Sequence, residues 1–239
     1  MGEVIYRVQH IRHEEKLYHD HCYENYKLFE QGSWLHRPVQ TVMDMLSLFE
    51  NQKDLKVLDL GSGVGRNSIP VAQKIKNLNG QVVCVDFLES ATSKLEQYAL
   101  ENHVENELKI VKEDIGEFDI LPGTFDYIVA VSSLEHVASE EVFERVLARM
   151  VEGTKDKGIN CLIVNSEVAE TEIKTGKRLE AMMEVNLSTE NLLRKLKAYY
   201  KGWHVLKELV KPLEYRIIRD DRQVSLKTNA ITFVVQRRG

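Results

Sequence analysis

The glycine loop Gly61-Ser62-Gly63-Val64-Gly65, which follows the apolar run Lys56–Leu60, constrains the fold more than any other feature of the sequence. A short apolar run that ends in glycine predicts a buried strand. The glycines let the backbone turn sharply and approach a ligand closely. The segment Arg66–Lys76 then has a helical pattern, with Pro70 in its first turn, where a missing N–H does little harm. A strand, a glycine loop and a helix in direct succession indicate the ligand-binding turn of an α/β domain.

Short apolar runs alternate with helical patterns along the rest of the chain. Strands are predicted at 56–60, 81–86, 108–112, 125–131 and 159–165, and helices at 66–76, 89–101, 139–151 and 188–200. Two last strands, near 203–210 and 230–236, are joined by the polar stretch 219–228, which has no room for a helix. We therefore predict an α/β fold: a doubly wound, mostly parallel seven-stranded sheet with an antiparallel C-terminal edge hairpin.

The chain lacks an obvious linker or repeat, and its 239 residues suit one large α/β domain. Residues 1–50 precede the first core strand and are predicted to form an N-terminal helical extension, with helices at 14–29 and 38–49, that covers the substrate pocket. Residues 51–239 are predicted to form the cofactor-binding domain.

Composition excludes several classes of protein. The net charge is −5 without a basic run, which argues against nucleic acid as a partner. No apolar run approaches the ~20 residues that a membrane helix needs, and there is no signal-peptide core, so a cytoplasmic protein is expected. Cys22, Cys84 and Cys161 are too far apart for a metal-ligand pair, and His19 and His21 do not share a helix face. No metal site is predicted.

The spacing of the glycines distinguishes between cofactors. Dinucleotide sites use G-x-G-x-x-G, in which the third glycine permits tight packing of the helix on the strand. Arg66 stands at that position in this chain. The loop therefore fits S-adenosylmethionine better than a nicotinamide cofactor.

Carboxylates at the predicted strand ends complete this site. Asp86 is placed to accept hydrogen bonds from ribose hydroxyls, and Asp114 from the adenine amino group, with Ile115 against the ring. Asp59 is assigned to the methionine ammonium group. All these elements converge on the crevice where open α/β sheets bind ligands. The predicted cofactor-binding set is Asp59, Gly61, Ser62, Gly63, Gly65, Arg66, Asn67, Asp86, Phe87, Asp114, Ile115, Val131 and Ser132.

The order Asp59-Leu-Gly-x-Gly-x-Gly, Asp86, Asp114 and Phe125-Asp126 resembles class I S-adenosylmethionine-dependent methyltransferases over roughly residues 55–165. The run Gly65–Ser68 and the segment 192–203 are similar to the tellurite-resistance-type methyltransferases. The resemblance implies methyl transfer to a small molecule, with a chalcogen oxyanion such as tellurite as one candidate acceptor. That family tends to carry His-Arg where this chain has Tyr215-Arg216, which puts tellurite in doubt.

Candidate catalytic residues follow the fourth strand. The segment 132–137 resembles the Leu-Glu-His-Val segment of quinone- and small-molecule methyltransferases, so His136 is either a general base or a group that shapes the pocket. Arg66 and Arg216 are candidates for binding an oxyanion, and Tyr26 is an alternative base. A non-catalytic cofactor-binding regulator and, disfavoured by Arg66, a nicotinamide-dependent oxidoreductase remain as alternatives. Monomer and homodimer are both compatible with the sequence.

Overall fold

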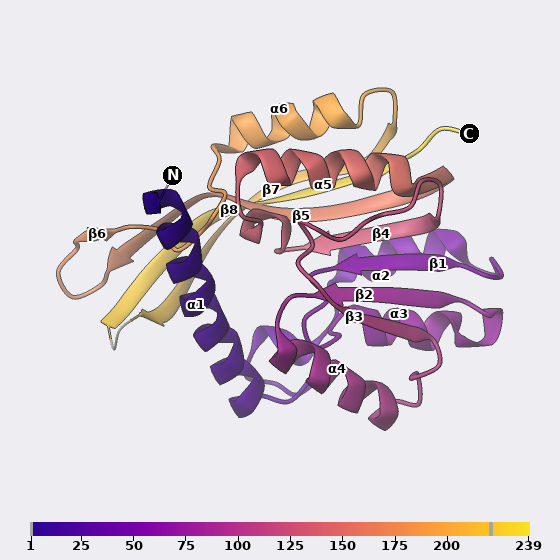
Figure 1. Cartoon of the computed structure of the whole chain (residues 1–239), viewed down its shortest axis with the longest axis horizontal. Coiled ribbons are helices and arrows are strands. Elements are labelled where there is room, and N and C mark those ends of the chain that lie inside the picture. Colours follow the sequence, from indigo (N-terminus) through magenta and orange to yellow (C-terminus); the bar gives the residue numbers. More distant parts are fainter. Residues whose placement is uncertain (1, 220–221) are drawn as a thin grey trace.

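The computed structural model describes residues 2–219 and 222–239, with side chains from residue 6 onward, and consists of one twisted sheet with helices on both faces (Figure 1). Seven strands follow the order β3-β2-β1-β4-β5-β8-β7, and the short β6 pairs with β5 outside that path. Strands β1 to β5 are parallel, whereas β8 is antiparallel to both β5 and β7. The strands are β1 (Lys56–Leu60), β2 (Gln81–Asp86), β3 (Leu108–Lys112), β4 (Phe125–Val131), β5 (Thr154–Glu172), β6 (Arg178–Leu179), β7 (His204–Arg219) and β8 (Arg222–Gln236). The predicted fold class is confirmed, with β6 as an addition.

Six α-helices accompany the sheet in the described residues. They are α1 (Gly2–Asn25), α2 (Gln40–Leu46), α3 (Ser68–Ile75), α4 (Glu89–Glu101), α5 (Glu140–Gly153) and α6 (Thr189–Tyr199). Short 3-10 turns lie at Trp34–His36, Ser47–Phe49, Lys76–Leu78 and Leu134–His136. Ser139 and Ser188 cap α5 and α6 by accepting backbone N–H bonds, as their sequence positions predict.

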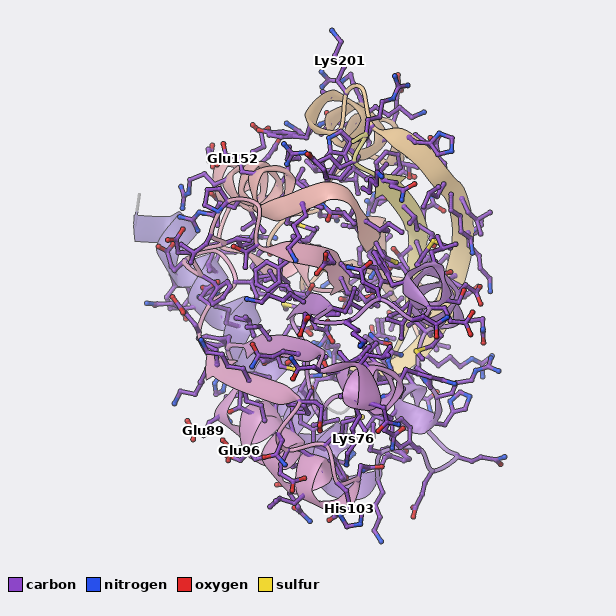
Figure 2. The ribbon with its side chains drawn as sticks, turned by 90° about the vertical axis from the view of Figure 1, so that its right-hand side faces the viewer. Lys76, Glu89, Glu96, His103, Glu152 and Lys201 are labelled. Atoms are coloured by element: carbon purple, nitrogen blue, oxygen red, sulfur yellow. The ribbon has the colours of Figure 1, made fainter. Side chains whose placement is uncertain are left out.

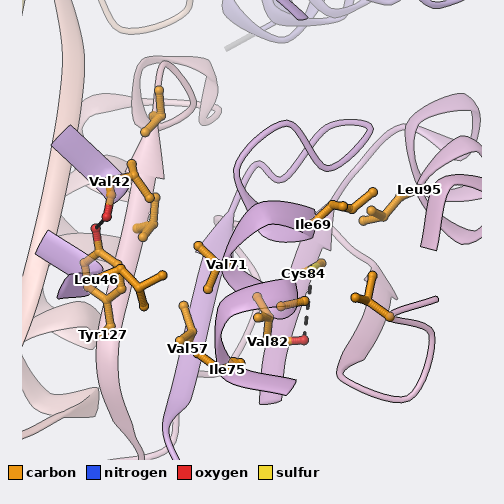
Figure 3. Close-up of a cluster of buried hydrophobic side chains, with 14 of the residues drawn as sticks. Val42, Leu46, Val57, Ile69, Val71, Ile75, Val82, Cys84, Leu95 and Tyr127 are labelled. Carbon is orange, nitrogen blue, oxygen red and sulfur yellow. Dashed lines mark hydrogen bonds between the residues drawn. The ribbon is translucent and has the colours of Figure 1, made fainter. Parts of the chain in front are cut away.

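The core consists of two apolar layers, one on each face of the sheet, because successive side chains of a strand point to opposite faces. Val57 and Tyr127 pack with α2, α3 and α4, whereas the adjacent Leu58 and Ile128 pack with α5 and α6. Figure 3 shows the first layer, in which the Tyr127 hydroxyl donates to the carbonyl oxygen of Val42 at 3.0 Å. Charged side chains such as Glu96, Glu152 and Lys201 project from the periphery (Figure 2). None of the helices in the described part of the chain combines the length and the apolar character that crossing a bilayer requires.

Strands β5, β7 and β8 run well beyond their predicted ends. We call their extensions the β arm: residues 166–172 of β5, 210–219 of β7 and 222–228 of β8, with β6 at its side. Most of the stretch 219–228, which was predicted to be a polar connection, is paired strand, and positions 220–221 lie outside the described residues. The prediction relied on apolar runs, but backbone pairing in the arm also orders polar residues. Only Val224 and Thr228 are buried on its β8 strand.

The N-terminal extension also differs from the prediction. Helix α1 begins at Gly2 rather than near residue 14 and ends at Asn25, before Phe29, which has a φ of 67°. Polar and apolar residues alternate in its early part, so the sequence pattern does not indicate a helix there. Its Arg7 and Arg12 instead reach across to the segment 180–184 and to Asp114. The second predicted helix, 38–49, is present as α2 and the 3-10 turn Ser47–Phe49. Met1, the first residue of the predicted extension, is outside the described residues.

A substitution at Gly61 tests whether the loop is fixed by its close contact with the residue after β4. Gly61 has a φ of +75°, and a Cβ there would lie 2.3 Å from Cβ of Ser133. Gly123 has a similar φ of +59° but open space around it. We expect Gly61→Ala to lower the free energy of unfolding by about 2–5 kcal/mol, and Gly123→Ala by about 1 kcal/mol. Urea denaturation measures both, and equal losses would show that the contact with Ser133 is unimportant.

Candidate active site

The site begins where β1 and β2 end side by side. The backbone N–H groups of Gly61 and Ser62 both donate to the carbonyl oxygen of Val85, at 2.8 and 3.0 Å. The next glycine, Gly63, donates to Oδ2 of Asp86 at 2.8 Å. Positive φ values at all three glycines of the loop make this path possible. The loop is therefore fastened to the end of β2 and held at the carboxyl edge of the sheet.

Asp86 is a fixed, half-buried carboxylate at this edge. Its Oδ1 accepts from the backbone N–H of Leu88 at 2.9 Å, while Oδ2 holds Gly63. Burial raises the pKa of Asp86 above its ordinary value, and the two N–H donors oppose that rise. Asp86 therefore stands where the sequence predicts the ribose-binding residue, with its position set by the backbone on both sides.

Ser62 of the glycine loop, and Asp59 and Asn67 on either side of the loop, have buried side chains. The buried Asp59 accepts from the Ser68 hydroxyl at 2.5 Å, and burial raises the pKa of Asp59 to about 6. Oδ1 of Asn67 accepts from the backbone N–H of Val39. Oγ of Ser62 is buried, with no hydrogen-bond partner among the residues described. Contact of Asp59 with the methionine ammonium therefore stays a prediction, because its observed partner lies within the fold.

Arg66 points toward the N-terminal extension. Its guanidinium carbon lies 4.9 Å from the ring centre of Trp34, and Nη1 donates to the carbonyl oxygen of the same residue at 3.1 Å. Tyr215 of the β arm is close enough to interact with its charge. Arg66 thus fastens the loop to residues on two other segments.

A side chain from α1 contacts Asp114, which is predicted to bind adenine together with Ile115, and Phe87, another predicted cofactor-binding residue. Nη2 of Arg12 pairs with Oδ2 of Asp114 at 2.7 Å. The Arg12 guanidinium carbon lies 5.2 Å from the ring centre of Phe87, a side chain that is 49% exposed. Ile115 is buried beside them.

The other half of the site follows β4. Val131 ends the strand, and Ser132 has a φ of 50°, which turns the chain toward Glu135 and His136. Glu135 is fully buried, and its Oε1 accepts from the backbone N–H and the side-chain amide of Asn165, at 2.9 and 2.7 Å. Its Oε2 has no hydrogen-bond partner in the described part of the chain.

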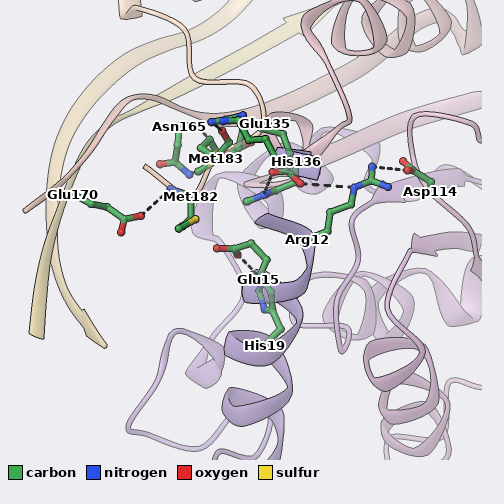
Figure 4. A network of polar contacts seen from close by, with 12 residues as sticks. Arg12, Glu15, His19, Asp114, Glu135, His136, Asn165, Glu170, Met182 and Met183 are labelled. Atoms are coloured by element: carbon green, nitrogen blue, oxygen red, sulfur yellow. Dashed lines mark hydrogen bonds and ion pairs between the residues drawn. The ribbon is translucent and has the colours of Figure 1, made fainter. Parts of the chain in front are cut away.

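His136 is held by a carboxylate that the sequence analysis did not single out. Its Nδ1 lies 3.1 Å from Oε2 of Glu184, whose side chain is 1% exposed, whereas that of His136 is 28% exposed (Figure 4). Burial alone lowers the pKa of His136, but the bond to Glu184 and the charges of Glu15 and Glu135 outweigh it and raise the pKa to about 9. His136 is therefore an oriented imidazole that carries a proton at neutral pH.

Two predicted catalytic residues lie outside this cluster. Arg216 is exposed on β7 in the arm, and Tyr26 is 40% exposed, beyond the end of α1, with its ring beside Gly32. The residues that sequence reasoning missed are Arg12 and Glu184, which ion pairs bring to Asp114 and His136. For Arg12, the one indication in the sequence is its spacing from Glu15 and His19, which places the three residues on one face of a helix. Among the described residues, no group of His, Cys, Asp or Glu side chains is arranged to hold a metal ion.

Comparison with known proteins finds a matching family model and structures of similar fold. Residues 57–158 match the family model described as a methyltransferase domain. TehB of Haemophilus influenzae is 21% identical, with a TM-score of 0.59 over 84% of this chain and 62% of that one. An S-adenosylmethionine-dependent methyltransferase of Methanosarcina mazei is 16% identical, with a TM-score of 0.60 over 84% and 99%. The [4+2]-cyclase SpnF is 14% identical, with a TM-score of 0.56 over 87% and 83%. At these identities the three structures show the fold alone, and no curated protein matches the sequence.

The carboxylate of Asp86 provides a test of the cofactor position. We expect Asp86→Asn to weaken binding of S-adenosylhomocysteine at least about fivefold, the scale of one lost hydrogen bond. Isothermal titration calorimetry measures the affinity, and Glu96→Gln, on the exposed side of α4, is the matched control. Unchanged affinity in Asp86→Asn would place the ribose elsewhere.

Proposed function

We propose that this class I S-adenosylmethionine-dependent methyltransferase methylates a small neutral or cationic nucleophile, foremost an amine, and that His136 receives the proton the nucleophile loses. One observation carries the proposal: His136 is held by the buried Glu184 just beyond the end of β4, among further carboxylates. A methyl group on a sulfonium centre is what the cofactor supplies when bound. The residues of the chain provide orientation, exclusion of water and a path for the proton.

The charges around His136 favour a cationic acceptor. Glu15, Glu135 and Glu184 all lie close enough to raise the pKa of His136. The nearest arginines are already engaged. Arg12 pairs with Asp114 and Glu184, and Arg219 of β7 pairs with Glu15 and Glu170. A surface in which carboxylates outnumber arginines attracts an ammonium group and repels an oxyanion.

The basicity of His136 also suits an amine. Proton transfer is most efficient between groups of similar pKa, and a pKa of about 9 at His136 is close to that of a simple ammonium group, about 10. When the nitrogen lone pair forms the new C–N bond, the N–H proton passes to Nε2 of His136 while Nδ1 stays on Glu184. His136 must be neutral before this step.

An oxyanion acceptor such as tellurite finds less support. Of the two arginines considered for it, Arg66 is stacked on Trp34, and Arg216 is exposed on the arm. The match to a methyltransferase domain also removes the reason to consider a nicotinamide-dependent oxidoreductase.

The function is tested by transfer of a labelled methyl group from S-adenosylmethionine to a panel of small amines, phenols and the oxyanions tellurite and selenite. We expect label in one or more amines and none in the oxyanions. Methylation of tellurite in preference to every amine would overturn the acceptor class. Cofactor binding without transfer to any member would favour a non-catalytic regulator.

The dependence of kcat/KM on pH tests the role of His136. Below pH 9 most His136 carries a proton, so loss of this proton should raise kcat/KM nearly tenfold per pH unit from 7 toward 9, in addition to the rise that comes from ionisation of an amine acceptor. Glu184→Gln removes the carboxylate that raises this pKa, so the contribution of His136 to the profile should level off at lower pH. Ionisation of the acceptor is common to both proteins and cancels in the comparison.

Glu180→Gln is the matched control for this profile, because Glu180 is exposed on the same segment and pairs with Arg7. Its profile should follow that of the native protein. An unshifted profile in Glu184→Gln, or an equal shift in Glu180→Gln, would show that His136 is not the base.

A further inference from the structure

Helix α1 lies across the carboxyl edge of the sheet, over the place where the cofactor is expected. Figure 1 shows it between α4 and the β arm, and Figure 4 shows Arg12, Glu15 and His19 along the side that faces the site. Arg12, His19 and Tyr23 are seven and four residues apart, which places them on one face of a helix. We call these three residues the α1 latch.

Arg12 contacts Asp114, which the sequence assigns to the adenine amino group, and Phe87, which the sequence assigns to cofactor binding. It donates to Asp114 at 2.7 Å and lies 5.2 Å from the ring centre of Phe87. A guanidinium is planar, offers N–H donors along its edge and stacks on aromatic rings. Adenine presents the same combination, a flat face and an amino group. Arg12 therefore resembles the ligand in both shape and donor pattern.

The rest of the latch extends toward the ribose side. The charge of His19 interacts with Asp86, and its Nδ1 is buried with no hydrogen-bond partner among the residues described. The Tyr23 hydroxyl lies 3.2 Å from the point that a Cβ on Gly63 would occupy. Tyr23 is 4% exposed and also contacts Trp34 through its ring. The latch thus spans the expected cofactor position from Asp114 to the glycine loop.

We propose that the α1 latch is an autoinhibitory element, in which Arg12 occupies the adenine position and must leave before S-adenosylmethionine can bind. This inference rests on the proposed function, because it takes that cofactor as the ligand. It adds that the affinity for the cofactor is set partly by a competition within the chain. The cofactor has to displace Arg12 from Asp114 and Phe87, and α1 has to withdraw.

The attachments of α1 are suited to reversible release. Most of them are polar: Ser90 donates to Asp20, Arg7 donates to the carbonyl oxygen of Met183, and Arg219 pairs with Glu15. The ion pairs of Arg7 with Glu180 and of Arg12 with Asp114 are partly exposed, and exposed ion pairs stabilise a contact only weakly. The buried apolar side chains of α1 are few in the part described, chiefly Ile11, Cys22 and Tyr23. A helix held in this way can leave the sheet without exposing much of the core.

The decisive variant is Arg12→Gln, which removes the ion pair and the stacking on Phe87 but keeps a helix-forming residue. Calorimetry with S-adenosylhomocysteine avoids turnover, and hydrogen exchange of residues 7–25 with and without this ligand reports on α1. We expect Arg12→Gln to bind the ligand about fivefold to tenfold more tightly than the native protein. Exchange in α1 of the native protein should increase when the ligand binds.

Lys16→Gln is the matched control, since it removes one positive charge from the same helix, at a site whose one ion pair among the described residues is with Asp20 of that helix. Its affinity should equal that of the native protein. Weaker binding in Arg12→Gln, or slower exchange in α1 on binding, would show that Arg12 belongs to the ligand site. Unchanged binding would show that Arg12 does not compete with the ligand, and either result would overturn the latch. Absence of binding in the native protein and in both variants would instead reject the proposed function. Binding by Arg12→Gln alone would support the latch most strongly.

Discussion

The attachment of the glycine loop to the end of β2 is the interaction on which the site depends. Three successive backbone N–H groups, of Gly61, Ser62 and Gly63, donate hydrogen bonds to Val85 and Asp86. The loop therefore cannot move without breaking these bonds at the edge of the sheet. The same register aligns Leu60 with Val85, and the Ser133 hydroxyl donates to the carbonyl oxygen of Leu60. One set of backbone bonds therefore positions both the expected cofactor residues and the start of the segment that carries His136.

The sequence pattern predicts the strands of the parallel half of the sheet, but it does not predict the β arm. Strands β1, β2 and β4 are buried and apolar, and a glycine, an acidic residue or a polar residue marks the end of each. The apolar runs and the residues that end them therefore indicate the same strand boundaries. Polar residues interrupt the apolar ones in the arm, and its order comes from pairing that includes segments far apart in the chain. Glu172 pairs with Val224, for example, and neither run is apolar enough to mark a strand. Local pattern carries no information about such pairing.

The candidate site likewise contains residues that the sequence predicts and residues that it does not. Asp86, Asp114 and His136 follow predicted strands, so the topology alone brings them to one edge. Arg12 and Glu184 come from a polar helix and from an insert between β6 and α6, 102 and 48 residues from their partners Asp114 and His136. Their charges look like ordinary solvated side chains in the sequence. Only the three-dimensional arrangement shows that Glu184 contacts both Arg12 and His136. Glu184 therefore links the acceptor side of the site to the side that Arg12 covers.

The position of α1 at the start of the chain has a consequence for the order of synthesis. Arg12 is translated 102 residues before Asp114, and Glu15 is translated 204 residues before Arg219. At about 5–20 residues per second, the second interval lasts roughly 10–40 s on the ribosome. The strands that form the expected cofactor site emerge within that interval, before the arm that helps to hold α1. Arg12 is thus available as soon as Asp114 emerges, but α1 lacks its contact with Arg219 until later, so a ligand present during translation competes with a less firmly held helix than a ligand added to the finished protein.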